Sequence, residues 1–114
     1  MHELSIALSI LDFVEEEAER RGGLITAIHL KLGPLSGVIG SALASAYDLA
    51  REGTPLEGTS LVIEDVPVVV FCPACARERV PVSSYEMCCG TCGEPTPQVI
   101  RGRELEIVAL EIQA

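Results

Sequence analysis

Four cysteines form two closely spaced pairs whose residue type and spacing could hold one metal ion. Cys72 and Cys75 form the first pair, Cys89 and Cys92 the second, and thirteen residues separate the pairs. Each pair can present two thiolates from one turn, and two such turns complete a tetrahedral shell around Zn²⁺ at about 2.3 Å. Gly93 follows the second pair, where the lack of a side chain lets backbone N–H groups turn towards the thiolates. Since a four-thiolate shell has no open position, the spacing predicts a structural zinc site without catalytic chemistry.

A fifth cysteine, Cys88, leaves the register of the second pair open. Cys88 could replace Cys89 as a ligand, because spacings of two to four residues all occur in zinc sites. We favour Cys89, since it makes both pairs Cys-x-x-Cys. A disulfide framework is disfavoured by the odd cysteine count and by the lack of a secretory signal. A thioredoxin-like redox site would need one exposed pair at a strand-to-helix junction, and here two pairs are present.

The composition excludes several classes of protein. With 114 residues, the chain is one domain or one small domain with a metal-bound insert. The residues are 48% hydrophobic without Trp, so the core must be aliphatic. The 17 acidic and 8 basic residues give a net charge of −9, which opposes binding of nucleic-acid phosphates. Since we find neither a signal peptide nor a transmembrane run, and the thiols need a reducing compartment, we expect a cytoplasmic protein away from membranes.

The elements that must position these cysteines begin with a helix, a strand and a second helix. Helical spacing from Leu4 to Arg20 predicts the first helix, which ends at Gly22 and Gly23. A strand with one buried face follows and ends at Gly33, and Ser36 is expected to cap the second helix. The apolar positions that carry these predictions are Leu4, Ala7, Leu8, Leu11, Val14 and Ala18, then Ile28, Leu30 and Leu32, then Leu43, Ala46, Tyr47 and Ala50.

Two long strands are predicted to flank the cysteine segment. One runs from about Ser60 through the apolar run 68–71 directly into the first cysteine pair. The other runs from about Val99 to Ile112, with a change of phase at Val108 that predicts a bulge. Residues 71–98 are therefore expected to form a zinc-binding module inserted between two strands.

The N-terminus is a second possible metal site. Met1 and His2 offer an α-amine, an amide nitrogen and an imidazole Nδ1, which together can close a five-membered and a six-membered chelate ring. A deprotonated amide favours Ni(II) or Cu(II) in square-planar geometry. Glu3 adds a backbone nitrogen and a carboxylate. Taken alone, a histidine at the second position is more typical of a frayed terminus, and His29 of a solvent-facing strand position, so any supporting role of His29 stays open.

Taken together, these features resemble the HypA (HybF) family of nickel metallochaperones in [NiFe]-hydrogenase maturation. The resemblance covers essentially the whole chain and rests on the segments Met1–Ser5, Gly33–Val38 and Gly53–Gly58 and on the two cysteine pairs. It implies two helices on a three-stranded mixed sheet, with residues 1–70 and 99–114 as a nickel-binding domain and 71–98 as an inserted zinc module. It also implies nickel ligands at Met1, His2 and Glu3 and zinc ligands at Cys72, Cys75, Cys89 and Cys92.

The resemblance further implies a role and partners. The protein would deliver Ni(II) to a hydrogenase large-subunit precursor together with the GTPase HypB, and in some organisms it would serve urease maturation proteins, as a monomer or a homodimer. We do not expect this protein to be an enzyme, because its sequence has no Ser-His-Asp set, no HExxH motif and no Gly-rich phosphate loop. The alternative is a zinc-ribbon module that binds protein or nucleic acid, for which only Arg77, Arg79 and Tyr85 are suitable contacts. Two departures from the family pattern are the additional Cys88 and the lack of a histidine between the cysteine pairs.

Overall fold

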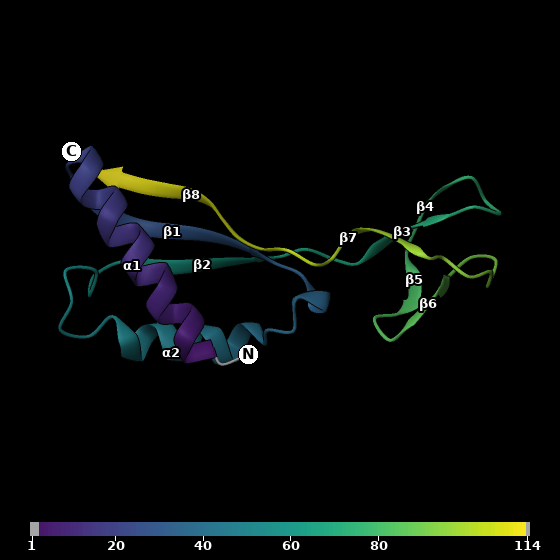
Figure 1. Cartoon of the computed structure of the whole chain (residues 1–114), viewed down its shortest axis with the longest axis horizontal. Helices are drawn as coiled ribbons and strands as arrows, with labels where there is room; N and C mark the ends of the chain where they lie inside the picture. The colour runs from purple at the N-terminus through teal and green to yellow at the C-terminus, as the bar shows by residue number, and fades with distance from the viewer. Residues whose placement is uncertain (1–2, 114) are drawn as a thin grey trace. The chain divides into compact units, whose positions relative to one another are not determined.

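The computed structural model of the chain describes residues 3–113, which form two compact units (Figure 1). Unit 1 consists of residues 3–30, 38–64 and 106–113, and unit 2 consists of residues 31–37 and 65–105. None of the helices in this part of the chain is long and apolar enough to cross a membrane. The assignment of residues 1–70 with 99–114 to nickel and of residues 71–98 to zinc remains a prediction.

The two helices of the described chain accompany a three-stranded sheet. The helices are α1 (Glu3–Arg21) and α2 (Gly40–Ala50), and the strands lie in the order β2 (Ser60–Asp65), β1 (Leu24–Leu32) and β8 (Leu105–Gln113). Hydrogen bonds show that β1 runs parallel to β2 and antiparallel to β8, so the sheet is mixed as predicted. The bonds are Thr59 Oγ1 to Ile25 O and Val66 N to Leu32 O, both 2.8 Å, Thr26 Oγ1 to Glu111 O, 3.2 Å, and Gly33 N to Glu104 O, 2.8 Å.

The first helix buries a face that is rotated from the predicted one. Ala7, Leu11 and Val14 are buried as expected, together with Ile10 and Glu17, whereas Leu4 and Leu8 are exposed. At 100° per residue, Leu4 and Leu8 lie to one side of the buried arc, so their inclusion in the stripe was wrong. The helix ends where predicted, because Gly22 and Gly23 have φ angles of +70° and +94° that an L-residue rarely adopts.

The second helix begins later than predicted. Residues Pro34–Ser36 form a 3-10 turn, and Gly37 follows in the left-handed conformation at φ +82°. The N-cap of α2 is therefore Ile39, and the prediction of Ser36 as the cap was wrong. Leu43 and Tyr47 form the buried stripe, and the Tyr47 hydroxyl donates a 2.9 Å hydrogen bond to Thr59 O, which satisfies a buried polar group.

Both long strands predicted from the sequence are interrupted. The first stops at Asp65 and resumes as β3 (Val69–Cys72), because Pro67 in the gap has no N–H to donate to a ladder. The second consists of β7 (Gln98–Arg101) and β8, with Gly102 in the gap at φ +124°. A Cβ at Gly102 would lie 2.9 Å from the Val68 Cα, so the two interruptions pack against each other within unit 2. The bulge at Val108 remains a prediction.

Two small antiparallel sheets form the rest of unit 2. One has the strand order β4 (Arg77–Arg79), β3, β7, and the other pairs β5 (Pro81–Ser83) with β6 (Glu86–Cys89). The last residues of β3 and β6 are Cys72 and Cys89, and both are buried. Each of these strands therefore ends in the first cysteine of one pair. Together, the two helices, the mixed three-stranded sheet and the four-cysteine module confirm the predicted fold class.

Candidate metal centre

The four paired cysteines converge on one point. The sulfur atoms of Cys72, Cys75, Cys89 and Cys92 all lie within 4.8 Å of one another, and the Sγ atoms of Cys72 and Cys92 are 3.5 Å apart. A tetrahedral shell with Zn–S bonds of about 2.3 Å has sulfur–sulfur edges of about 3.8 Å. Both the donor type and the spacing of the thiols therefore fit Zn²⁺, which would hold unit 2 together through four thiolate bonds when bound.

Tight turns after β3 and β6 aim backbone N–H groups at these sulfurs. Cys75 N donates to Cys72 Sγ at 3.3 Å, and Thr91 N and Cys92 N both donate to Cys89 Sγ at 3.4 Å. Gly93 has a φ of +81° and its N–H donates to Cys89 O at 2.8 Å, so it closes the second turn while its neighbours point at the sulfur. Such N–H donors spread the charge of a metal-bound thiolate.

The corresponding position of the first turn is occupied by a different residue. Ala76 follows Cys75 as Gly93 follows Cys92, and Ala76 has a φ of +56°. The left-handed conformation costs a residue with a Cβ about 1–2 kcal/mol. The first turn therefore keeps the geometry of the second without the glycine that makes it favourable.

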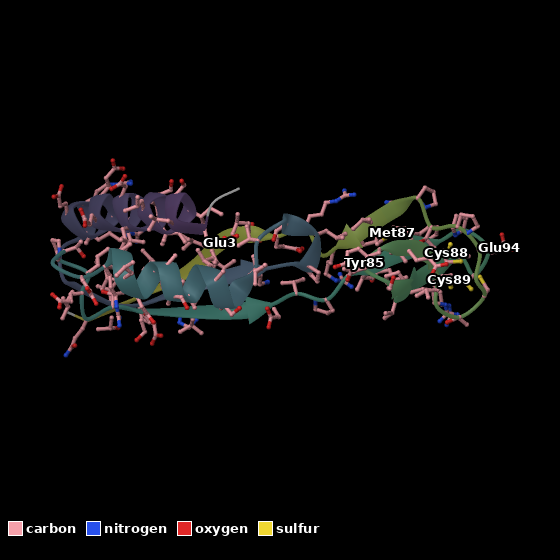
Figure 2. The ribbon with its side chains drawn as sticks, turned by 90° about the horizontal axis from the view of Figure 1, so that it is seen from below. Glu3, Tyr85, Met87, Cys88, Cys89 and Glu94 are labelled. Atoms are coloured by element: carbon pink, nitrogen blue, oxygen red, sulfur yellow. The ribbon has the colours of Figure 1, made fainter. Side chains whose placement is uncertain are left out.

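The structure separates Cys88 from the four converging sulfurs. Cys88 precedes Cys89 in β6 and forms an isolated bridge with Pro95, and its sulfur does not belong to the group. Figure 2 shows Cys88 and Cys89 at the same end of unit 2, near Glu94. Since successive side chains of a strand point to opposite faces, only one of the two can face the cluster, and it is Cys89. This geometry favours the Cys89 register, although the zinc-ligand assignment itself stays a prediction.

The thiols of the second pair differ in acidity. The backbone N–H of Cys92, followed by other hydrogen bonds, lowers the pKa of Cys89 to about 6. For Cys92, the backbone N–H of Glu94 acts to lower the pKa, but the Cys72 thiol, burial and the other thiols outweigh it and raise the pKa to about 12. Within this pair, Cys89 is thus the thiol that the fold prepares better as an anionic ligand, because a metal ligand must be deprotonated.

Arg79 is a residue near the cluster whose position the sequence did not reveal. It lies opposite Val70 in the β3–β4 ladder, and a hydrogen bond with the Cys75 thiol is the main reason that the pKa of its guanidinium is raised. From the sequence, Arg79 is only a possible contact of the alternative zinc-ribbon module that binds protein or nucleic acid. The pairing of β4 with β3 brings Arg79 back beside the first cysteine turn, where it contacts Cys75.

Two of the three predicted nickel ligands, Met1 and His2, lie outside the described residues. Glu3 begins α1 and is half-buried (Figure 2). His29 lies in β1 with its Nε2 2.7 Å from Glu111 Oε2 in β8, a partner that only the strand order identifies. Within residues 3–113, the four cysteines are the one cluster of three or more His, Cys, Asp or Glu side chains with metal-binding spacing.

Comparisons with known proteins agree with this architecture. Residues 1–112 match the family model described as "Hydrogenase/urease nickel incorporation, metallochaperone, hypA". The hydrogenase maturation factor HypA of Chloroflexus aurantiacus is 47% identical over 112 residues, which cover 97% of this chain and 98% of that protein. The corresponding factor of Thermomicrobium roseum is 40% identical over 129 aligned positions, covering 99% and 98% of the two chains.

Solved structures show the same likeness. The solution structure of the Ni metallochaperone HypA from Helicobacter pylori superposes with a TM-score of 0.66 at 26% identity, covering 100% of this chain and 99% of that one. A second solution structure of a HypA protein gives a TM-score of 0.71 at 25% identity and covers 99% and 97% of the two chains. The whole-chain family match, the close relatives and the shared fold lead to one conclusion: the chain belongs to the HypA family of nickel-incorporation metallochaperones.

Proposed function

We propose that this protein carries Ni(II) as transient cargo at its N-terminus, through Met1, His2 and Glu3, and holds a structural Zn²⁺ through Cys72, Cys75, Cys89 and Cys92. The match to a nickel-incorporation family from residue 1 onwards is the observation that carries the proposal. The cysteine cluster supports it indirectly. Four thiolates around one ion leave no open coordination position, so a metal that must be passed on needs ligands elsewhere.

The N-terminal donors suit a metal that is handed over. An amine, an amide nitrogen and an imidazole favour Ni(II) over the ions that prefer oxygen ligands. A small ligand set at the end of a chain can be exchanged one donor at a time, whereas a closed four-thiolate site cannot. Of the proposed ligands, Glu3 begins α1, where the positive end of the helix dipole favours a carboxylate.

The charge distribution of the chain supports cargo binding in unit 1. The stretches 3–30, 38–64 and 106–113 contain twelve acidic and three basic residues, whereas unit 2 contains five of each. All of the net charge of −9 therefore resides in unit 1. An acidic surface raises the local concentration of divalent cations and speeds their capture.

Delivery completes the proposed function. We place the protein in the cytoplasm, where it acts as a chaperone and not as an enzyme, and where it passes Ni(II) towards a hydrogenase large-subunit precursor in cooperation with HypB, or towards urease maturation proteins. The family description names both hydrogenase and urease as destinations of the nickel. Zinc in this scheme stabilises the geometry of unit 2, because binding by four thiolates contributes directly to folding free energy.

A nickel titration of the untagged protein tests the proposal. We expect His2→Ala to abolish stoichiometric Ni(II) binding in calorimetry while zinc content and circular dichroism stay unchanged, because His2 supplies the imidazole of the chelate. His29→Ala is the matched control, since it removes the other histidine of the chain and should keep nickel binding. A tag joined before Met1 should also weaken binding, because it converts the donor amine into an amide. Nickel binding at full affinity in the His2 variant would refute the N-terminal site.

A further inference from the structure

Arg79 lies on the face of β4 that also carries the first cysteine turn. In the β3–β4 ladder, Arg77 pairs with Cys72 and Arg79 pairs with Val70. Alternate residues of a strand share a face, and so do residues that are directly opposite each other, so both arginines lie on the side of Cys72. Arg77 is exposed, whereas Arg79 is half-buried. Of the two arginines, Arg79 is therefore the one that the fold withdraws in part from solvent.

Each sulfur of the cluster receives a hydrogen bond from an N–H donor. Backbone N–H groups donate to the sulfurs of Cys72, Cys89 and Cys92. The sulfur of Cys75 is instead reached by a side-chain donor, the guanidinium of Arg79. A hydrogen bond from a cation to a thiolate is charge-assisted and stronger than one from a neutral group. Cys75 thus depends on a side chain for the support that the fold gives to the other three sulfurs through the backbone.

The guanidinium of Arg79 and the thiolates offset each other's charge inside unit 2. A Zn²⁺ ion with four thiolates carries two surplus negative charges, and Cys72 and Cys89 are buried, so this charge needs compensation. The Nε of Arg79 is itself buried and has no hydrogen-bond partner among residues 3–113, so the nearby thiolates must offset its desolvation. The hydrogen bond with Cys75 raises the pKa of Arg79, and the charges of Cys75, Cys89 and Cys72 add to this effect against burial.

We infer that Arg79 is a positioning residue of the metal centre, where its guanidinium serves as the counter-ion of the four thiolates and holds Cys75 in place as a ligand, a role that rests on the proposed binding of Zn²⁺ there. Neither neighbouring arginine can replace it. Arg101 Nη2 is ion-paired to Glu78 Oε1 at 2.7 Å, and Arg77 points its charge into solvent. Because a guanidinium does not lose its proton in proteins, the compensation is independent of pH.

The zinc affinity of Arg79→Gln protein tests this role by competition with a chromophoric chelator. Its zinc dissociation constant should rise about 10- to 100-fold, the usual effect of removing a partner that orients a metal ligand. Arg79→Lys keeps the charge without the planar fork and should recover part of the loss. Arg77→Gln is the matched control, because it removes an exposed arginine from the same face of β4. It should change the constant by no more than about twofold.

Cobalt-loaded protein separates this role from a general weakening of the fold. In tetrahedral Co(II) bound to the same thiolates, the sulfur-to-metal charge-transfer band reports the electron density on sulfur. Arg79→Gln removes a positive donor and raises that density, so the band should shift to longer wavelength while the ligand-field bands and the circular dichroism stay unchanged.

The outcomes distinguish the role of Arg79 from the zinc site itself. Wild-type protein that binds no stoichiometric zinc would refute the proposed zinc site, and the counter-ion with it. If the wild type holds zinc, three results would overturn the role of Arg79 alone. They are an Arg79→Gln protein with the dissociation constant and cobalt band of the wild type, equal effects of Arg77→Gln, and an Arg79→Lys protein that binds zinc as weakly as Arg79→Gln.

Discussion

Exchanging Cys88 and Cys89 for serine, one at a time, tests the metal centre most sharply. The two residues are neighbours in β6, yet only the Cys89 sulfur belongs to the converging group. Cys89 is buried, receives two backbone N–H bonds, and has its pKa lowered to about 6, chiefly by the N–H of Cys92. A serine hydroxyl at this position is neither an anion at neutral pH nor long enough to restore the sulfur–metal bond.

The expected change in zinc affinity follows from dividing the free energy of zinc binding equally among the four ligands. Structural Zn²⁺ sites contribute about 10–16 kcal/mol, so one of four thiolates is worth about 2.5–4 kcal/mol. Cys89→Ser should therefore raise the zinc dissociation constant about 10²- to 10³-fold. Cys88→Ser should change it by no more than about twofold, because the Cys88 sulfur lies outside the cluster.

Competition with a chromophoric zinc chelator, together with metal analysis after dialysis, measures both constants. Loss of zinc from the Cys88 variant and retention by the Cys89 variant would move the ligand assignment to Cys88, and retention by both would mean that the thiols are interchangeable. Zinc-free Cys72→Ser/Cys75→Ser protein extends the test. We expect residues 71–98 to lose their order while the helices and the mixed sheet persist in circular dichroism, because the aliphatic core packs without the metal.

Three further predictions concern stability. Folding lowers the pKa of Glu17 below its usual value of 4.5, chiefly through the side-chain hydrogen bond from Arg21 in α1. The contribution of Glu17 to folding stability is therefore present above pH 4.5 and is lost as the pH falls below it. The thermal midpoint should drop more between about pH 6 and about pH 3 in the wild type than in Glu17→Gln. Ala76→Gly should stabilise zinc-loaded unit 2 by about 0.5–1 kcal/mol in urea unfolding, because glycine relieves the left-handed φ of +56°. Gly33→Ala should cost about 3 kcal/mol or more, because its Cβ would lie 2.1 Å from a backbone oxygen, whereas Gly58→Ala, into open space, should be nearly neutral.

Local patterns in the sequence predicted local features well. The spacing of the cysteines predicted which four sulfurs converge, and the glycines after Arg21 predicted the end of α1. Errors arose where a distant segment determines the conformation. The break in the second predicted strand depends on the close packing of Gly102 against Val68. These two residues are 34 positions apart in the sequence, so a local hydrophobic pattern cannot indicate their contact. Ser36 failed as a cap because the chain turns again at Gly37 before the helix begins.

At the candidate metal centre and at His29, the contacts that the sequence did not predict also involve segments that are far apart in the chain. Arg79 reaches Cys75 only because β4 returns beside β3, and Glu111 meets His29 only because β8 pairs with β1. Pairings between strands that are far apart in sequence are set by the topology and not by local periodicity. The metal-binding turns could therefore be predicted from the sequence, and the charged side chains around them could not.

The late position of β8 in the chain has a consequence for how the protein is made. The mixed sheet needs β8, but 39 residues separate the end of β2 at Asp65 from Leu105. At about 5–20 residues per second, a ribosome takes about 2–8 s to synthesise this stretch. During that interval β1 has an unpaired edge, while both cysteine turns of the proposed zinc site emerge and become able to capture a metal ion. With Zn²⁺ at the cluster as proposed, unit 2 folds around its metal before the sheet of unit 1 is complete, and the cellular zinc supply acts on an unfinished chain.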